Sequence, residues 1–254
     1  MMSPFDRIEL IADQSAARYR STLDILRNQE TAALMTQDAT TPAAVRALKT
    51  SLERIGDIFL TDEEEKLRGL MEEMFDLAHT EAARQMGDGM RLSAQHIDTF
   101  LEFGVDEIEA QLVRDVAQII KHHRKRGIEA QMRANARGLS VNEALMEIRI
   151  EGIGDRASLW FTDRAGRRIA SQKHMRRFYR ALMRDGYLSA LASLLALRGA
   201  DSARIVHPDP SHKSFGEIVR LDGAKPDLSS YESVFHPNSQ ATLLVENLFQ
   251  EKYT

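Results

Sequence analysis

Apolar residues recur at helical spacing through much of the first 137 positions. The clearest stripe lies in residues 105–126 and consists of Val105, Ile108, Leu112, Val116, Ile119 and Ile120. Spacing of three or four residues places such side chains on one helical face, so we expect a helix here. A cationic run and Gly127 follow, which predicts that this helix ends there. The pattern also predicts helices over 5–36, 42–60, 61–86 and 93–103.

Capping residues predict where several of these helices begin. Thr41 followed by Pro42 is a favourable N-cap and first-turn pair. Thr61, with acidic residues directly after it, predicts a second start inside the same stretch. Ser140 and Glu143 form a capping-box pattern, which predicts a further short helix.

The pattern changes after about residue 150. Residues 158–162 are rich in aromatic and apolar side chains and predict a strand, followed by a turn at 163–166. A long helix is expected over 171–198, ending at Gly199, with short strands at 203–206, 217–221 and 241–244. We therefore expect a mainly α fold with a C-terminal α+β unit, in which a small sheet of short strands packs on a long helix. The expected division is a helical region at 1–137 and an α+β domain at 138–254.

Composition narrows the classes of protein and of site. The 254 residues include no cysteine, which excludes a disulfide framework, cysteine-ligated metals and a thiol nucleophile. No uncharged apolar run is long enough for a membrane span, and the N-terminus lacks the features of a signal peptide. We also find no phosphate-binding glycine loop, zincin helix or serine elbow. The sequence itself indicates no cofactor.

Charge is strongly partitioned along the chain. Residues 1–120 contain 12 basic and 23 acidic residues, whereas residues 121–184 contain 16 and 6. Such a basic block requires a polyanion, acidic neighbours or solvent around it. Three interpretations remain open: a solvated face paired with the acidic N-terminal half, a contact with nucleic-acid backbone, or an acidic protein partner. The candidate polyanion contacts are Arg164, Arg167, Arg168, Lys173, Arg176, Arg177 and Arg180.

Aromatic residues in this block do not alternate with the arginines. Trp160-Phe161 and Phe178-Tyr179 form two adjacent pairs, an arrangement poorly suited to stacking on successive bases of a single strand. Contacts to phosphate are therefore the expected mode, and they would make binding to double-stranded DNA non-specific and sensitive to salt.

Histidines near the expected C-terminal strands are candidate metal ligands or acid–base groups. His207, Asp209, His212 and His236 all lie in predicted loops. The alternative is that these side chains hydrogen-bond loop backbone and hold irregular chain in place.

Several other residues are expected to be architectural. Asp163 is placed to accept from turn amides, and Gly166 to adopt a positive φ. Arg184 has Asp163, Asp185 and Asp201 as possible partners, between which the sequence does not choose. The remaining candidates of this kind are His236, Pro237 and Asn238.

Residues 138–245 contain an ordered set of short motifs. The motifs are Gly138-Leu139-Ser140 with Ala144-Leu145, Phe161 to Arg168, Phe178 to Asp185, Gly199-Ala200-Asp201 before Ile205-Val206, His207 to His212, and Val234 to Asn238. Taken in this order, the set resembles the minor capsid, or head-morphogenesis, proteins of tailed bacteriophages, typified by the phage Mu minor head protein. The resemblance covers about 100 residues, and it rests on the order of the motifs rather than on any one of them.

The resemblance implies a structural role near the portal, on the inner side of the head. It implies portal and head proteins as partners, a multimeric assembly, and a place in head assembly, DNA packaging and DNA ejection. The protein would then reside in the virion, after assembly in the host cytoplasm. The sequence departs from the family where Ser239, Gln240 and Ala241 replace the usual cysteine and basic residues. Any metal or structural clip built on those cysteines is absent or replaced.

Two alternatives from other classes remain. One is a metal-dependent or nucleotide-acting enzyme that uses the C-terminal histidines, with Arg180 or Arg184 holding an anionic substrate. The other is a helical interaction module whose basic helix binds the acidic half of a second copy.

Overall fold

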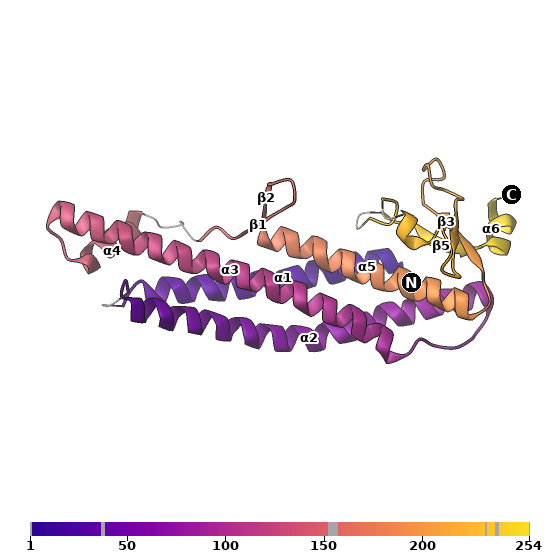
Figure 1. Cartoon of the computed structure of the whole chain (residues 1–254), viewed down its shortest axis with the longest axis horizontal. Coiled ribbons are helices and arrows are strands. Elements are labelled where there is room, and N and C mark those ends of the chain that lie inside the picture. The colour runs from indigo at the N-terminus through magenta and orange to yellow at the C-terminus, as the bar shows by residue number, and fades with distance from the viewer. Residues whose placement is uncertain (1, 37–38, 152–156, 232, 237–238, 254) are drawn as a thin grey trace. The chain divides into compact units, whose positions relative to one another are not determined.

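The computed structural model describes residues 2–36, 39–151, 157–231, 233–236 and 239–253 (Figure 1). Long helices dominate the first two thirds of the chain, and short strands follow. The helices are α1 (Pro4–Ala33), α2 (Pro42–Met86), α3 (Ala94–Arg137), α4 (Val141–Glu151), α5 (Ser171–Leu197) and α6 (Glu246–Tyr253), with a 3₁₀ turn at Leu228–Tyr231. The strands are β1 (Trp160–Thr162), β2 (Arg168–Ala170), β3 (Ser202–Val206), β4 (Ile218–Arg220) and β5 (Thr242–Val245).

The strands form two small antiparallel sheets. β1 and β2 make a hairpin in which Phe161 lies opposite Ile169. The second sheet has the order β4-β3-β5, so the central strand pairs antiparallel with both neighbours. The expectation of a mainly α fold with a C-terminal α+β unit is confirmed.

Packing divides the chain into two compact units. Unit 1 contains Met1–Asp13, Glu65–Gly104 and Arg177–Thr254, and unit 2 contains Gln14–Glu64 and Val105–Arg176. Each unit takes residues from both sides of position 137, where the sequence suggested a boundary. The reason is that the long helices α1, α2, α3 and α5 each contribute one part to each unit.

Unit 2 is built on parts of α1, α2 and α3 that lie side by side (Figure 1). Five residues of the predicted apolar stripe of α3 are buried, and Val105 is half-buried. The buried residues are Ile108, Leu112, Val116, Ile119 and Ile120. Tyr19 of α1 is completely buried and meets Phe59 of α2 edge to face, with ring centroids 5.9 Å apart. These contacts bury one face of each helix, which stabilises the unit by removing apolar surface from water.

A polar stripe also runs along the buried side of α3 in unit 2. Asp115 is fully buried, and its carboxylate accepts hydrogen bonds from the Tyr19 hydroxyl at 2.7 Å, the Ser171 hydroxyl at 2.7 Å and the Gln111 amide at 3.1 Å. Burial raises the pKa of Asp115, and the three donors act in the opposite direction. The carboxylate therefore ties α1 and the first residue of α5 to α3.

Unit 1 places the three-stranded sheet beside helical segments. The side-chain amide of Gln85 of α2 makes two hydrogen bonds with the edge strand β5. Its nitrogen donates to the Leu243 carbonyl, and its oxygen accepts from the Val245 amide, each at 2.9 Å. Gly186 of α5 faces Met71 of α2, where a Cβ would lie only 2.5 Å from the Met71 sulfur. The absence of a side chain at Gly186 therefore permits this close approach.

Three predicted helix boundaries, at Thr61, Gly104 and Gly127, are wrong. α2 is continuous through Thr61, whose hydroxyl donates to the carbonyl of Asp57 at 3.0 Å instead of capping a new helix. Glu63, which was expected in the first turn of a new helix, is only 1% exposed and forms a two-point ion pair with Arg18 of α1 at 2.8 and 2.9 Å.

α3 likewise continues through Gly104 and Gly127, where the sequence suggested interruptions. Both glycines serve close packing. A Cβ at Gly104 would lie 2.8 Å from side-chain atoms of Leu67 and Leu182, and one at Gly127 would lie 2.9 Å from Thr40. The helix ends instead at Gly138, whose φ of +69° closes it.

Other boundary expectations are confirmed. The Thr41 hydroxyl accepts from the Ala44 amide at 3.2 Å, and Ser140 and Glu143 make the reciprocal bonds of a capping box. The long helix α5 and the strands β1, β3, β4 and β5 occur where predicted, with small shifts at their ends. β2 and α6 were not predicted from the sequence, because three and eight residues are too few to show a clear periodicity.

Within the described ranges, none of the helices has the combination of length and apolar character that crossing a membrane requires.

We expect Tyr19→Phe to lower the free energy of unfolding by about 1.5–3 kcal/mol, because it removes a hydroxyl donor from the buried Asp115 carboxylate. Urea denaturation followed by circular dichroism measures this change.

Tyr231→Phe is the matched control, since its hydroxyl donates to the Ile218 carbonyl in an exposed setting at 3.1 Å. This substitution should change the free energy of unfolding by no more than about 0.5 kcal/mol. Equal losses in the two variants would contradict a special role for the buried carboxylate.

Candidate nucleic-acid interface

The turn of the β1–β2 hairpin is organised by Asp163. Its carboxylate accepts from the backbone amides of Ala165 at 3.0 Å and Arg167 at 2.8 Å, and from the Arg167 side chain at 2.7 Å. These bonds lower the pKa of Asp163, with the Arg167 amide as the largest cause. Gly166 has a φ of +76°, a conformation that glycine adopts at low cost.

The base of the hairpin is held by α3. The Gln118 side chain donates to the Trp160 carbonyl at 2.7 Å and accepts from the Trp160 amide at 3.1 Å, as a neighbouring strand would. On the other side, the Ser171 hydroxyl binds Asp115, and its amide donates to the Leu159 carbonyl at 3.2 Å. Both ends of the hairpin are therefore held by polar side chains of one helix.

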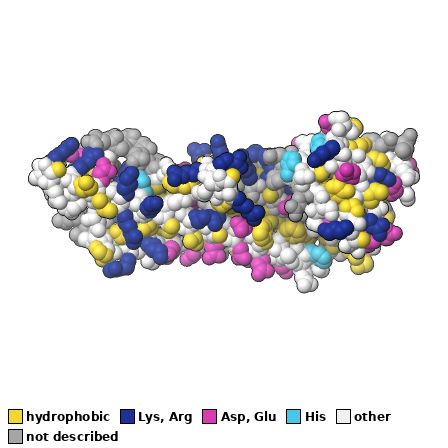
Figure 2. All heavy atoms as spheres, turned by 45° about the horizontal axis from the view of Figure 1, so that its top comes forward, with side chains coloured by type: hydrophobic (Ala, Val, Ile, Leu, Met, Phe, Trp, Pro, Cys, Tyr) yellow, Lys and Arg dark blue, Asp and Glu magenta, His cyan; other side chains and the backbone are white. Residues whose placement is uncertain are grey.

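Four of the predicted polyanion contacts are brought together on this hairpin and the first turn of α5. Each of the four side chains is exposed, and Arg167 retains 79% of its side-chain surface. In Figure 2, Lys and Arg side chains gather over this region, near the middle of the view. We call this set the cationic hairpin surface; it consists of Arg164, Arg167, Arg168 and Lys173.

The aromatic rings near this surface contact other side chains of the protein. The guanidinium of Arg168 lies 4.6 Å from the centroid of the Trp160 ring, a cation–π distance. Phe161 stacks on His174 with centroids 3.7 Å apart, and Arg114 lies over the same ring at 5.4 Å. The rings therefore orient cations and pack the hairpin, so the surface presents charge rather than stacking platforms.

The other three predicted contacts are placed differently. Arg176 is half-buried and makes interactions within the protein, whereas Arg177 is exposed. Arg180 keeps only 12% of its side-chain surface exposed and forms an ion pair with Glu9 of α1. That pairing removes Arg180 from the residues available to a polyanion.

Arg184 is a structural cation. It is 1% exposed and donates to the backbone carbonyls of His236 and of Ala241, the latter at 3.2 Å. The rings of Phe5 and Phe235 each lie 5.9 Å from its guanidinium carbon. Burial lowers the pKa of Arg184 to about 10, while the charge of Asp185 acts in the opposite direction. Of the three carboxylates considered from sequence, only Asp185 influences it, and the hydrogen bonds go to carbonyls.

The C-terminal histidines do not assemble with Asp209 into a metal site in the described part of the chain. His207 and His212 stack with centroids 4.6 Å apart, and the ring of His207 accepts from the Asp209 amide at 3.1 Å. The Asp209 carboxylate is bound to Ser211, which lowers its pKa. No group of three or more metal-ligating side chains was found among the described residues.

The remaining predicted motif residues lie in unit 1 or outside the described ranges. The Asp201 carbonyl accepts from the Leu221 amide at 3.0 Å, at the start of the three-stranded sheet. His236 is exposed, and its carbonyl binds Arg184. Pro237 and Asn238 lie outside the residues that the structure describes.

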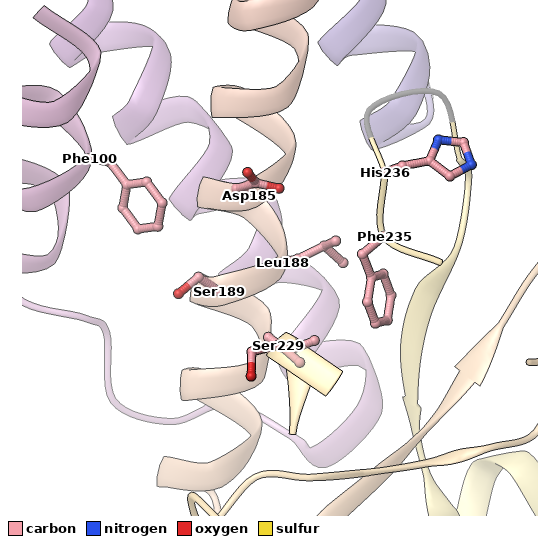
Figure 3. Close-up of a pocket in the computed structure, with 8 residues that line it drawn as sticks. Phe100, Asp185, Leu188, Ser189, Ser229, Phe235 and His236 are labelled. Atoms are coloured by element: carbon pink, nitrogen blue, oxygen red, sulfur yellow. The ribbon is translucent and has the colours of Figure 1, made fainter. Parts of the chain in front are cut away.

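A pocket of about 500 Å³ in unit 1 is lined by residues that include Asp185, Ser189, Ser229 and His236 (Figure 3). Although Asp185 remains partly exposed, surrounding protein removes water from its carboxyl and raises its pKa to about 6. Figure 3 shows the His236 ring directed away from Asp185. The two side chains therefore do not face each other in this pocket.

Sequence reasoning missed the polar residues that hold the hairpin, Gln111, Asp115 and Gln118. Their spacing of four and then three residues within an apolar helical pattern is the signal that could have revealed them. Comparisons with protein-family models, with curated proteins and with solved structures found no match to this chain.

We expect Arg184→Met to lower the free energy of unfolding by about 2 kcal/mol or more, because it leaves two backbone carbonyls without their donor. Arg177→Met, on the exposed face of the same helix, should cost at most about 0.5 kcal/mol. Chemical denaturation distinguishes the two, and similar losses would argue against the carbonyl contacts.

Asp185 should titrate near pH 6 in the folded protein, measured by carboxyl NMR. Because its folded pKa lies above the ordinary 3.8, the folded state binds a proton in this window that the unfolded state does not. The unfavourable contribution of the ionised carboxylate is full above pH 6 and disappears as the pH falls towards 4. Asp185→Asn should therefore be more stable than the wild type at pH 7.5, with the difference shrinking on acidification. An equal difference at every pH would contradict the raised pKa.

Proposed function

We propose that this protein is a structural minor component of a tailed-phage head that contacts packaged double-stranded DNA through the cationic hairpin surface. One observation carries the DNA part of the proposal. Residues 157–176 include five Lys or Arg and one acid, Asp163, and four of those five cations are exposed together on the hairpin and first turn of α5. Such a surface attracts the phosphate backbone irrespective of sequence.

The geometry favours phosphate over base recognition. A hairpin turn with Arg164 near its tip presents point charges, while Trp160 and Phe161 are occupied by internal partners. The only acid of the segment is bound to turn amides and Arg167, so it offsets a single cation. Each phosphate neutralised releases condensed counterions, so affinity should fall steeply as salt rises.

The ordered motifs of residues 138–245 support the phage-head part of the proposal. Several of them coincide with structural devices: the Asp163–Gly166 turn, Arg184 on α5 and the loop at His236 that Arg184 holds. On this proposal the partners are portal and head proteins, the location is the capsid interior, and the role is assembly, packaging or ejection rather than catalysis.

Replacing Arg164, Arg168 and Lys173 together by Gln should weaken binding to random-sequence duplex DNA and reduce the slope of log K against log salt by up to about three. Fluorescence anisotropy over a salt series measures both quantities. Arg167 is left intact because it binds Asp163 and supports the turn.

The control is Arg20→Gln, Arg46→Gln and Arg54→Gln, which removes the same charge from exposed positions of α1 and α2. This variant should keep the wild-type slope. If the two triple variants behave alike, net charge rather than the cationic hairpin surface governs binding. If the wild type fails to bind DNA even at low salt, the DNA-contact proposal is wrong.

A further inference from the structure

Unit 2 contains a groove between α2 and α3 with a volume of about 750 Å³. The floor is apolar and includes Leu60, Leu112, Val116 and Ile120. Gly56 of α2 lies in the same floor, and a Cβ there would meet no atom within 4 Å. The two helices therefore leave open space next to Gly56, whereas other side chains pack directly against Gly104 and Gly127.

The rim of this α2–α3 groove exposes large apolar side chains. Val113 is 61% exposed and Ile128 is 64% exposed. Contiguous apolar surface rimmed by charge is typical of protein–protein contacts in soluble proteins. The apolar floor and rim thus provide the driving force for association, and the charges around them decide the partner.

Charge is divided between the two ends of the groove. Glu109 of α3 and Asp57 of α2 lie towards one end, whereas Lys121, Arg124 and Lys125 of α3 lie towards the other. None of the ion pairs found among the described residues involves any of these five side chains. The remaining charged lining residues, Lys49 and Glu53 of α2, pair with each other at 3.2 Å. A partner must therefore present cations at the first end and carboxylates at the second.

We propose that the partner is a second copy of this chain, docked so that the two α3 helices run antiparallel across a two-fold axis. An antiparallel second copy presents the required charges, because its basic end faces the acidic end of the first. Glu109 and Arg124 are fifteen residues apart, close to four helical turns, so they lie on the same side of α3. An axis between Val116 and Ala117 brings Glu109 opposite Arg124 of the other copy twice. The small, exposed Ala117 side chain permits close approach at that axis.

This proposal concerns a surface other than the cationic hairpin surface and does not depend on DNA binding. The pair closes a four-helix arrangement of two α2 and two α3 segments, which buries the apolar floor of both grooves. Attraction between charges across the axis weakens in salt, while burial of Val113 and its neighbours does not. Dimers should therefore persist at high salt, with reduced affinity.

Sedimentation velocity of the full-length protein without DNA tests the proposal. We expect a concentration-dependent dimer of two 28.7 kDa chains. Val113→Glu should weaken dimerisation by about tenfold or more, because it places a charge on the apolar rim that the second copy would cover, four residues from Ala117. Ile58→Glu is the matched control: Ile58 is 63% exposed on α2 but does not line the groove, so the dimer should be retained.

Charge exchange tests the antiparallel register. Glu109→Lys or Arg124→Glu alone places like charges opposite each other twice per dimer and should weaken it. The double variant restores opposite charges and should recover most of the wild-type affinity, with circular dichroism confirming that every variant is folded.

A monomer at all concentrations in low salt would overturn the proposal and leave the groove to a different protein. A dimer that Val113→Glu does not weaken would also overturn it. Failure of the double variant to recover affinity would reject the register centred between Val116 and Ala117. None of these outcomes bears on the salt dependence of DNA binding, so the two proposals fail separately.

Discussion

The buried carboxylate of Asp115 is the constraint on which unit 2 depends. A charge or polar group taken out of water must be fully hydrogen-bonded, and here the donors come from α1, from α3 itself and from the first residue of α5. The carboxylate can be buried at this point only if α1, α3 and the start of α5 place all three donors around it at the same time. Because α5 begins at Ser171, directly after β2, the same carboxylate also determines where the hairpin emerges.

Both small sheets use a glutamine from a long helix as a substitute for a neighbouring strand. Gln118 binds both backbone groups of Trp160 in unit 2, and Gln85 binds Leu243 and Val245 in unit 1. Sheets of two or three short strands are marginal by themselves, and their edges have unpaired backbone groups. The glutamine bonds satisfy part of each edge, which lets a short hairpin present cations while its base stays fixed.

Unit 2 has two surfaces of different chemistry. The cationic hairpin surface is polar, with its aromatic rings engaged internally, and it suits a polyanion whose contacts are weakened by salt. The α2–α3 groove is apolar, with opposite charges at its ends, and suits a protein helix. The cations of the basic block therefore differ in their surroundings. Arg164 and Lys173 are exposed to solvent, whereas Arg180 and Arg184 bind other segments of unit 1.

Sequence alone determined the features that depend on neighbours along the chain. These are the helical spacing of α3, the caps at Thr41 and Ser140, the turn at Asp163–Gly166 and the concentration of positive charge after residue 120, because local periodicity, capping and composition are set by adjacent residues. Tertiary structure decided the rest. The sequence predicted helix ends at Gly104 and Gly127, yet each lies inside α3. At each position another segment of the chain occupies the space that a side chain would fill. Arg184 was predicted to pair with a carboxylate, yet it donates to backbone carbonyls more than fifty residues away along the chain. Only the folded chain brings those carbonyls to its buried guanidinium.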